Sequence, residues 1–341
     1  MKKMRIMRLL VMLSILVIIL SACSGNNANG DEKSSEKGGD VYTFKVSHVT
    51  QESHVWHQTA LKFGEELEKL SDGRMKLEIY PASQLGLEKD MVQQLETGSL
   101  DFGFLTNAYM STRQDSLNAW FMPFTFKNLE EAVKMRESEA AKQMLEDLNS
   151  QGLVGLDFIF AGNRHILMKN GHVSSPQDLK GKKIRIIGSP AIQEFWEKVG
   201  AGPTAMPLSE VYTSLQTGVI DGIDIDLDAL VTEKYYENAE NLTLTNHITF
   251  PSVIVMSQKT YDKLTPEDQE IVKKALKAAA DWGVQQAIQR ENKNLEELKK
   301  HGVKVKELTD TSAFDSIAKE VKDKYAEKSP VIKKFLEEAK Q

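Results

Sequence analysis

An arginine interrupts a short aliphatic run near the middle of the chain. In KKIRIIGSP, residues 182–190, strand alternation places Ile184 and Ile186 on one face and Arg185 and Ile187 on the other. A guanidinium group is planar, permanently charged and able to donate two parallel hydrogen bonds to a carboxylate. The pattern therefore predicts an anion-binding strand, although an arginine that pairs with an acid at an exposed strand edge would leave the same pattern.

Aspartates at alternate positions resemble a calcium loop only superficially. Asp224, Asp226 and Asp228 have the right spacing. Ala229, however, stands where the loop needs glycine, and Tyr235 stands where it needs a bidentate glutamate. We expect no metal here.

A histidine cluster and an aromatic cluster also have simpler interpretations. His48, His54 and His57 have no standard metal-ligand spacing, so a loop or a helix start is the favoured interpretation. The segment AWFMPFTF, residues 119–126, is typical of core or lobe packing. The chain contains no G-x-S-x-G, H-E-x-x-H or phosphate-loop motif, and we expect no cofactor.

The N-terminal residues predict export. Four cationic residues among the first eight precede an apolar run of twelve residues, which is shorter than the roughly 20 that span a bilayer as a helix. The following LSACSG resembles the lipobox of bacterial lipoproteins, whose cysteine is diacylated and becomes the N-terminus. We therefore expect a signal peptide over residues 1–22 and a lipid anchor on Cys23.

The composition of residues 23–40 predicts a disordered tether. After the cysteine, this segment contains no apolar residue larger than alanine. With only one cysteine, the exported protein must be stabilised by its core and not by intramolecular disulfides. The formal net charge of −6 becomes −10 without the four cationic residues of the signal peptide. This acidic balance argues against nucleic acid or an anionic surface as a partner.

The remaining chain has the pattern of an α/β protein. Strand-like YTFKVSHV is followed by a helix-like stretch that ends at Ser71-Asp72-Gly73 and by strand-like MKLEIYP. Two stretches resemble each other, LETGSLDFGF (95–104) and LQTGVIDGID (215–224). Each indicates a helix that ends at Thr-Gly and a strand that begins at an aspartate. Two lobes of similar construction are the expected consequence.

Two helix starts in the second half are marked by proline. Ser175-Pro176 opens a short helix that Gly181 closes, and Thr265-Pro266 opens a helical stretch that runs to His301. The second stretch is about 36 residues, or roughly 54 Å. It either spans two lobes or kinks near Gly283, and we favour spanning.

From Val41 to the C-terminal helices, the chain resembles the solute-binding proteins of TRAP transporters, the tripartite ATP-independent periplasmic systems. Five segments carry the resemblance in order and spacing: YPASQLGLEKDMVQQLETGSLDFGF, GNRHIL, SPQDLKGKKIRI, GAGPTAMPLSEVYTSLQTGVIDG and TNHI. The resemblance implies a type II periplasmic-binding-protein fold, with two α/β lobes, a ligand cleft between them and a long hinge helix across both. We expect lobe I to comprise residues 41–162 with 251–290, and lobe II residues 163–250 with 291–341.

The same resemblance implies which residues bind ligand. Arg185 occupies the position that binds the ligand carboxylate, and Arg164 matches a second arginine at the crossover between the lobes. Glu88 is expected in the cleft, although it also suits the first turn of a helix. Further cleft residues are implied on the first lobe: His48, Thr106 and Asn107.

The sequence departs from the family after Asp-Gly, where many relatives have Gln-Glu-Asn-Pro and this chain has Ile223, Asp224, Ile225 and Asp226. Strand alternation predicts that Asp224, Asp226 and Asp228 share one face. If that face lines the cleft, it accepts hydrogen bonds from hydroxyl groups and repels a second carboxylate. We therefore expect a sugar acid more than a dicarboxylate, although a solvated acidic face is an alternative. Leu208 stands where some relatives have an aromatic residue.

We accordingly expect a protein, not an enzyme, that captures a small organic acid on the extracytoplasmic face of the cell membrane. It would deliver the acid to TRAP permease subunits for cation-driven uptake. Three alternatives stay open: a C4-dicarboxylate-binding protein of the same family, a ligand-sensing lipoprotein that docks on a receptor kinase, and an exported sugar-acid lyase or isomerase.

Overall fold

The computed structural model describes residues 40–340. The predicted signal peptide, the lipid anchor on Cys23 and the tether up to Gly39 lie outside the described residues. Among the helices of the described part, none combines the length and apolar character needed to cross a bilayer.

The first sheet has the order β2-β1-β3-β9. Its central strand β1 runs parallel to β2 and β3, whereas β9 runs antiparallel to β3. The predicted strand–helix–strand start is confirmed, and the helix α2 ends as expected just before Gly73, which has a φ of 82°. The bounds of these elements are β1 Tyr42–His48, α2 Val55–Leu70, β2 Met75–Tyr80, α3 Glu88–Thr97, β3 Phe102–Thr106 and β9 Thr249–Ser257.

The second sheet repeats this construction with the order β6-β5-β7-β4. Strand β5 runs parallel to β6 and β7, and β7 runs antiparallel to β4. Beyond β4, the strand β8 pairs with β4 and β10 pairs with β8. The bounds are β4 Leu153–Met168, β5 Lys183–Ile186, α7 Pro190–Val199, β6 Gly202–Ala205, α8 Leu208–Thr217, β7 Gly222–Asp226, α9 Leu227–Thr232, β8 Asn241–Leu244 and β10 Lys304–Glu307.

The two similar stretches of sequence occupy equivalent places in the two sheets. Helices α3 and α8 both end at a glycine in the left-handed region, Gly98 and Gly218. In the first sheet, Asp101 accepts a hydrogen bond from the backbone N–H of Lys45 at 2.8 Å. In the second, Asp221 accepts one from Lys183 at the same distance. The predicted repeat is confirmed, with each strand starting one residue after its aspartate.

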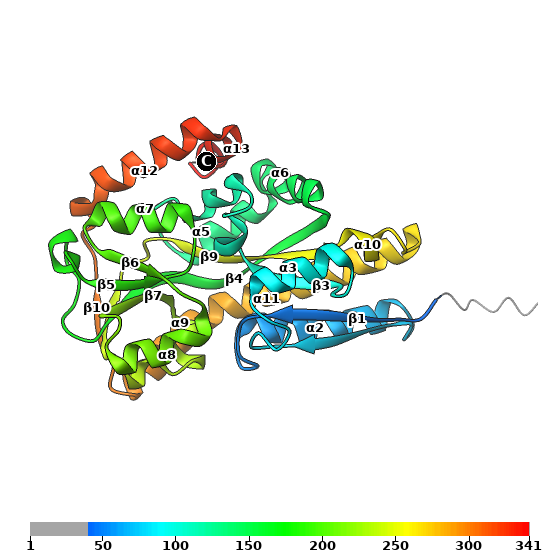
Figure 1. Cartoon of the computed structure of the whole chain (residues 1–341), viewed down its shortest axis with the longest axis horizontal. Helices are drawn as coiled ribbons and strands as arrows, with labels where there is room; N and C mark the ends of the chain where they lie inside the picture. The colour runs from blue at the N-terminus through cyan, green and yellow to red at the C-terminus, as the bar shows by residue number, and fades with distance from the viewer. Residues whose placement is uncertain (1–39, 341) are drawn as a thin grey trace, which may run out of the picture. The chain divides into compact units, whose positions relative to one another are not determined.

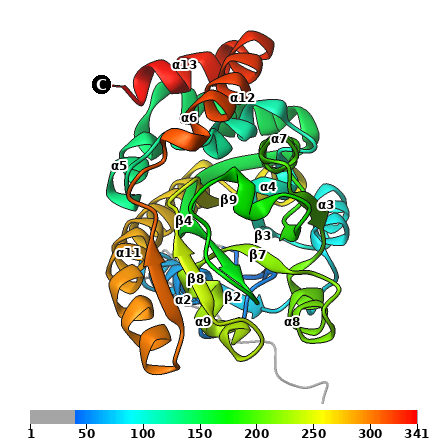
Figure 2. The ribbon, with the colours of Figure 1, turned by 90° about the vertical axis from the view of Figure 1, so that its left-hand side faces the viewer.

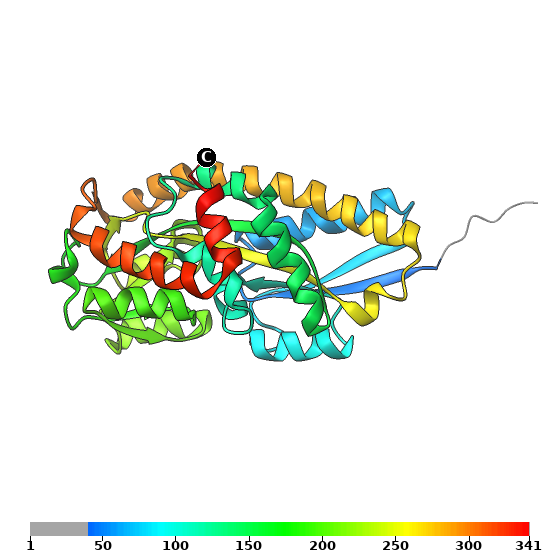
Figure 3. The ribbon, with the colours of Figure 1, turned by 90° about the horizontal axis from the view of Figure 1, so that it is seen from above.

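The long strand β4 joins the two sheets. Its first part pairs with β9 and its last five residues, Arg164–Met168, pair with β7. Helix α11 (Pro266–Lys300) has 35 residues and packs against α2, β4 and α9 (Figures 1 and 3). The predicted long helix is confirmed, and it is continuous through Gly283. Gly283 serves close packing, because a Cβ there would collide with Thr59 of α2.

Helices α6, α12 and α13 lie on the same side of the two sheets (Figures 1 and 2). Helix α12 packs against α7, and α13 packs against α6 and η1, where Trp120 and Phe335 have ring centroids 4.9 Å apart. The predicted packing role of the 119–126 aromatic cluster is thus confirmed for Trp120. The predicted short helix after Ser175 is a 3₁₀ helix, η4. The predicted assignment of residues 291–341 to lobe II stays a prediction.

The bounds of the remaining helices are α4 Asn107–Met110, η1 Asp115–Phe121, α5 Leu129–Lys134, η2 Met135–Glu137, α6 Glu139–Asp147, η3 Leu148–Gln151, η4 Pro176–Leu179, η5 Tyr235–Glu237, α10 Gln258–Tyr261, η6 Ser312–Phe314, α12 Asp315–Lys328 and α13 Pro330–Glu338.

Candidate ligand-binding site

Arg185 is fully buried in β5, between β6 and β7, and so does not lie at a sheet edge. Its Nε and Nη2 donate to the carbonyl oxygen of Met206 at 3.2 and 2.9 Å. Its Nη1 has no hydrogen-bond partner among residues 40–340. Burial lowers the pKa of Arg185 to about 10, so the group stays cationic at neutral pH. A buried cation with a free N–H donor is suited to binding an anion.

Arg164 is buried near the start of the β7-paired part of β4, but its charge is already compensated. Its Nε donates to Oδ1 of Asp224 at 2.5 Å and its Nη1 to Oδ2 of Asp226 at 3.3 Å. Its Nη2 donates to the backbone carbonyl of Asp224, and its guanidinium carbon lies 4.3 Å from the ring centroid of Phe250. The two arginines therefore differ, and only Arg185 offers an unpaired donor.

Both carboxylate oxygens of Asp224 are occupied. While Oδ1 accepts from Arg164, Oδ2 accepts from Trp196 Nε1 at 2.8 Å and lies 3.2 Å from Nε2 of His247. Burial alone would raise the pKa of this carboxyl group, but the Arg164 charge and His247 bring the pKa well below its usual range. Asp224 therefore holds Arg164 in place.

Thr106 and Asp226 occupy equivalent positions in the two sheets. Each is the last residue of its strand, β3 or β7, and each side chain caps the following helix. The hydroxyl of Thr106 accepts from Tyr109 N at 3.1 Å, and Oδ1 of Asp226 accepts from Ala229 N at 2.8 Å. The carboxyl ends of the parallel strands, where ligands of open α/β sheets bind, thus present these two side chains.

The prediction that three aspartates share one face of a strand is wrong for the third of them, Asp228. Strand β7 ends at Asp226, so Asp228 lies in the first turn of α9 and not on the strand. Its carboxylate accepts from Val55 N at 2.7 Å, Arg290 Nη1 at 3.0 Å and Asn294 Nδ2 at 2.8 Å. Strand alternation failed here because a helix cap at Asp226 turns the chain.

Glu88 is the first residue of α3, but its carboxylate accepts hydrogen bonds from a residue of another element. The backbone N–H and the hydroxyl of Thr106 donate to its Oε1 and Oε2 at 2.6 and 3.0 Å. Burial raises the pKa of Glu88 to about 7 despite these two hydrogen bonds. The group therefore changes charge close to neutral pH.

His48 and Asn107 are buried beside this region. The ring of His48 lies 3.1 Å from Nδ1 of His57 and 3.0 Å from the hydroxyl of Thr50, and burial lowers its pKa to about 3. Both amide atoms of Asn107 lack partners within residues 40–340. In the same range, no group of three or more histidine, cysteine or acidic side chains is arranged to hold a metal ion.

Two adjoining cavities lie at the strand ends. The inner cavity has a volume of about 20 Å³, and the outer cavity, toward α3 and α8, about 280 Å³. The inner cavity is lined by Val49, Thr50, His54, Trp56, Thr106, Ala161, Arg164, Arg185, Ile187, Leu208, Ile225, Asp226, Ala229 and Phe250. The outer cavity is lined by Val49, Ser83, Leu87, Glu88, Lys89, Tyr109, Ile187, Gly188, Ala205, Met206, Pro207 and Leu208.

The structure brings together most of the predicted ligand-binding residues. Thr106, Arg164, Arg185 and Asp226 line the inner cavity and Glu88 the outer one, whereas His48, Asn107 and Asp224 line neither. Sequence reasoning missed three aromatic residues of the inner cavity. These are His54, Trp56 and Phe250.

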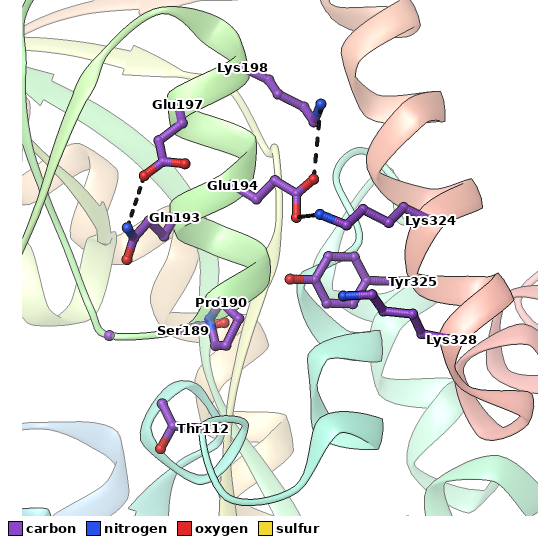
Figure 4. A pocket seen from close by; sticks show the side chains of 11 residues that line it. Thr112, Ser189, Pro190, Gln193, Glu194, Glu197, Lys198, Lys324, Tyr325 and Lys328 are labelled. Carbon is purple, nitrogen blue, oxygen red and sulfur yellow. Dashed lines mark hydrogen bonds and ion pairs between the residues drawn. The ribbon is translucent and has the colours of Figure 1, made fainter.

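A wider hollow between α7 and α12 has a different character (Figure 4). Its volume is about 770 Å³, and it is an open groove flanked by charged side chains that pair with each other. Lys324 contacts Glu194 at 2.7 Å, and Lys198 contacts Glu320 at 2.5 Å. The inner cavity, with its unpaired buried donor, is therefore the better candidate for binding an acid.

Comparison with known proteins places this geometry in a family. Residues 46–329 match the model of the bacterial extracellular solute-binding proteins, family 7. The chain belongs to this family. Its members are solute-binding proteins of TRAP transporters, which bind small acids outside the cytoplasm and work with membrane permease subunits; they are not enzymes.

The similar proteins of this TRAP family include binders of two kinds of acid. A Sulfitobacter structure with bound β-D-galacturonate is 29% identical, with a TM-score of 0.81 and 86% and 98% of the two chains covered. The sugar acid-binding protein of Advenella mimigardefordensis, in complex with galactonate, is 26% identical, with a TM-score of 0.83 and coverage of 88% and 98%. The C4-dicarboxylate-binding periplasmic protein DctP of Rhodobacter capsulatus is 29% identical over 314 residues, or 91% and 94% of the two chains. The two-lobed fold predicted from sequence is confirmed.

Proposed function

We propose that this TRAP solute-binding protein captures a sugar acid with a single carboxylate, which Arg185 binds. The free Nη1 of Arg185 carries the proposal, because Arg164 is compensated by Asp224 and Asp226. One unpaired buried cation suits one carboxylate, and a second carboxylate would meet Asp226 or Glu88. The carboxyl groups of Asp226 and Glu88 and the hydroxyl of Thr106 are suited to hydroxyl groups of the ligand.

Binding is coupled to closure of the two lobes. The inner cavity is little larger than the roughly 10–15 Å³ that one water needs, so a sugar acid enters only when the lobes part. Two contacts hold the lobes together by capping a helix of the other lobe. Asp228 of α9 accepts from Val55 N at the start of α2. Asn118 Oδ1 of η1 accepts from Ser189 Oγ at 3.1 Å and Ala191 N at 3.2 Å, at the start of α7.

The test is a thermal-shift screen of the soluble chain from Ser24 onward against D-galacturonate, D-galactonate, D-glucuronate, succinate and malate. Ligand at a thousand times its dissociation constant adds about 4 kcal/mol of stability. We expect a shift with the sugar acids that is lost in Arg185→Ala and kept in Arg113→Ala, a control arginine on the surface. A larger shift with succinate or malate than with any sugar acid would contradict the proposed ligand class and favour the dicarboxylate alternative.

We also propose that Cys23 carries the lipid anchor and holds the protein on the extracytoplasmic face of the membrane. The sequence LSAC at residues 20–23 supports this proposal. Growth with labelled palmitate should label the wild-type protein and leave Cys23→Ser unlabelled. Equal labelling of the two proteins would contradict the anchor.

A further inference from the structure

Two buried N–H donors on the wall of the inner cavity have no hydrogen-bond partner within residues 40–340. One is Nη1 of Arg185, and the other is Nε1 of Trp56, whose side chain is 1% exposed. Leaving a buried donor unpaired costs free energy, and such groups are rare in folded proteins. The buried Trp196, by contrast, uses its N–H to bind Asp224. The Nε1 of Trp120 is also unpaired, but Trp120 lines neither cavity, so of these two donors the one of Trp56 is placed to meet a ligand.

The residues that surround Trp56 hold its indole ring in place at the inner cavity. Its backbone N–H donates to Nδ1 of His54, the N-cap of α2, at 3.1 Å. The His54 ring packs edge-on against the indole, with ring centroids 5.2 Å apart. The ring of Phe250 stacks on the indole, with centroids 6.1 Å apart and an interplanar angle of 13°. Phe250 in turn lies under the guanidinium of Arg164. A ring held on two sides keeps its N–H in one place.

We infer that Trp56 Nε1 donates a hydrogen bond to the bound acid, at an oxygen on the carbon next to the carboxylate. The inference rests on the proposed role of Arg185. Because the inner cavity is about the size of one water, donors on its wall meet the same end of the ligand. Since an indole N–H only donates, it favours an acid that has an acceptor at this place.

This contact narrows the ligand class to acids that are hydroxylated or oxidised next to the carboxylate. Galactonate has a hydroxyl group on that carbon, whereas succinate has only hydrogens there. Trp56 would thus favour galactonate over succinate without adding charge to the site.

The test compares D-galactonate with 2-deoxy-D-galactonate by isothermal titration calorimetry. Trp56→Phe keeps an aromatic ring and removes the N–H, so we expect it to weaken galactonate binding about tenfold, the range of one hydrogen bond, and to leave the 2-deoxy acid unchanged. Trp120→Phe is the matched control, because Trp120 is also buried with an unpaired Nε1 but lines neither cavity. Equal weakening for both acids in Trp56→Phe, or no weakening, overturns the inference.

A second measurement does not depend on how well the variant folds. The chain has four tryptophans, and in the wild-type protein each indole N–H gives its own ¹⁵N-resolved NMR signal. Galactonate should shift the Trp56 signal and leave that of Trp120 in place; an unmoved Trp56 signal in the bound protein contradicts the inference. Wild-type binding that persists in Arg185→Ala, or no binding of any of the sugar acids, overturns the proposed function and this inference with it.

Discussion

Arg164 and Arg185 lie on strands that both pair with β7, yet they depend on different neighbours. Arg164 neutralises the buried Asp224, while Arg185 bonds to a backbone carbonyl. Removing Arg164 leaves a buried carboxylate without its cation, a change that typically costs about 3–5 kcal/mol. We expect Arg164→Ala to lower the free energy of unfolding by that amount and Arg185→Ala by clearly less. Urea denaturation without ligand measures both, and equal losses would contradict the distinction.

At the scale of single residues, Glu88 makes the stability of the protein depend on pH. Its pKa of about 7 in the folded protein lies above the ordinary value of 4.5, so the folded state binds more protons than the unfolded state between these values. Stability contributed by this group is therefore lost as the pH rises from 4.5 to 7. Burial also raises the pKa of Glu291 to about 7, so both groups act in the same window.

Two variants separate these contributions. Glu88→Gln and Glu291→Gln should each flatten the fall in melting temperature between pH 4.5 and 7. Of these two residues, only Glu88 lines the outer cavity. We therefore expect the affinity of the wild-type protein for D-galacturonate to rise as the pH falls from 8 to 6. This rise should vanish in Glu88→Gln and persist in Glu291→Gln. If Glu88→Gln keeps the pH dependence of binding, Glu88 does not contact the acid.

At the scale of elements, the helices α2 and α7 are capped across the cleft. Their positions correspond, because α2 follows β1 and α7 follows β5. By the predicted lobe bounds, each receives an acceptor from the other lobe, Asp228 or Asn118. We expect these contacts to form only in the closed arrangement and so to stabilise it without touching the ligand.

We expect Asp228→Ala and Asn118→Ala each to weaken D-galacturonate binding about tenfold, the effect of about 1.4 kcal/mol lost from the closed form. Asp178→Ala is the control, because Asp178 caps η4 from within its own lobe, with Ser175 N at 2.9 Å. Calorimetry at fixed pH measures the affinities. Unchanged affinity in both cap variants would show that the caps do not stabilise closure.

The elements themselves were largely predictable from sequence, because hydrophobic alternation and the glycine and proline positions are local signals. The paired Thr-Gly stretches predicted the repeat, and Thr265-Pro266 predicted the start of α11. Asp228 was assigned to the wrong element, because the cap at Asp226 ends β7 without a glycine or proline. Trp56 was missed because its ring packs against Phe250, almost 200 residues away in sequence.

At the scale of the whole described chain, β4, β9 and α11 connect the two sheets, whereas the amides of Val55 and Ala191 bond to Asp228 of α9 and Asn118 of η1, outside these three elements. Opening of the cleft should therefore expose the start of α2 and of α7 while leaving the connecting elements paired. We expect the backbone amides of Val55 and Ala191 to exchange with deuterium more slowly when D-galacturonate is bound. The amide of Asp178, bonded to Ser175 O at 3.2 Å within η4, should exchange equally in both states. Slowing of Val55 alone would mean that α7 stays bonded to Asn118 in the free protein, so that the Asn118 cap does not depend on closure. Equal exchange at both amides in the free and bound protein would mean that binding does not close the lobes.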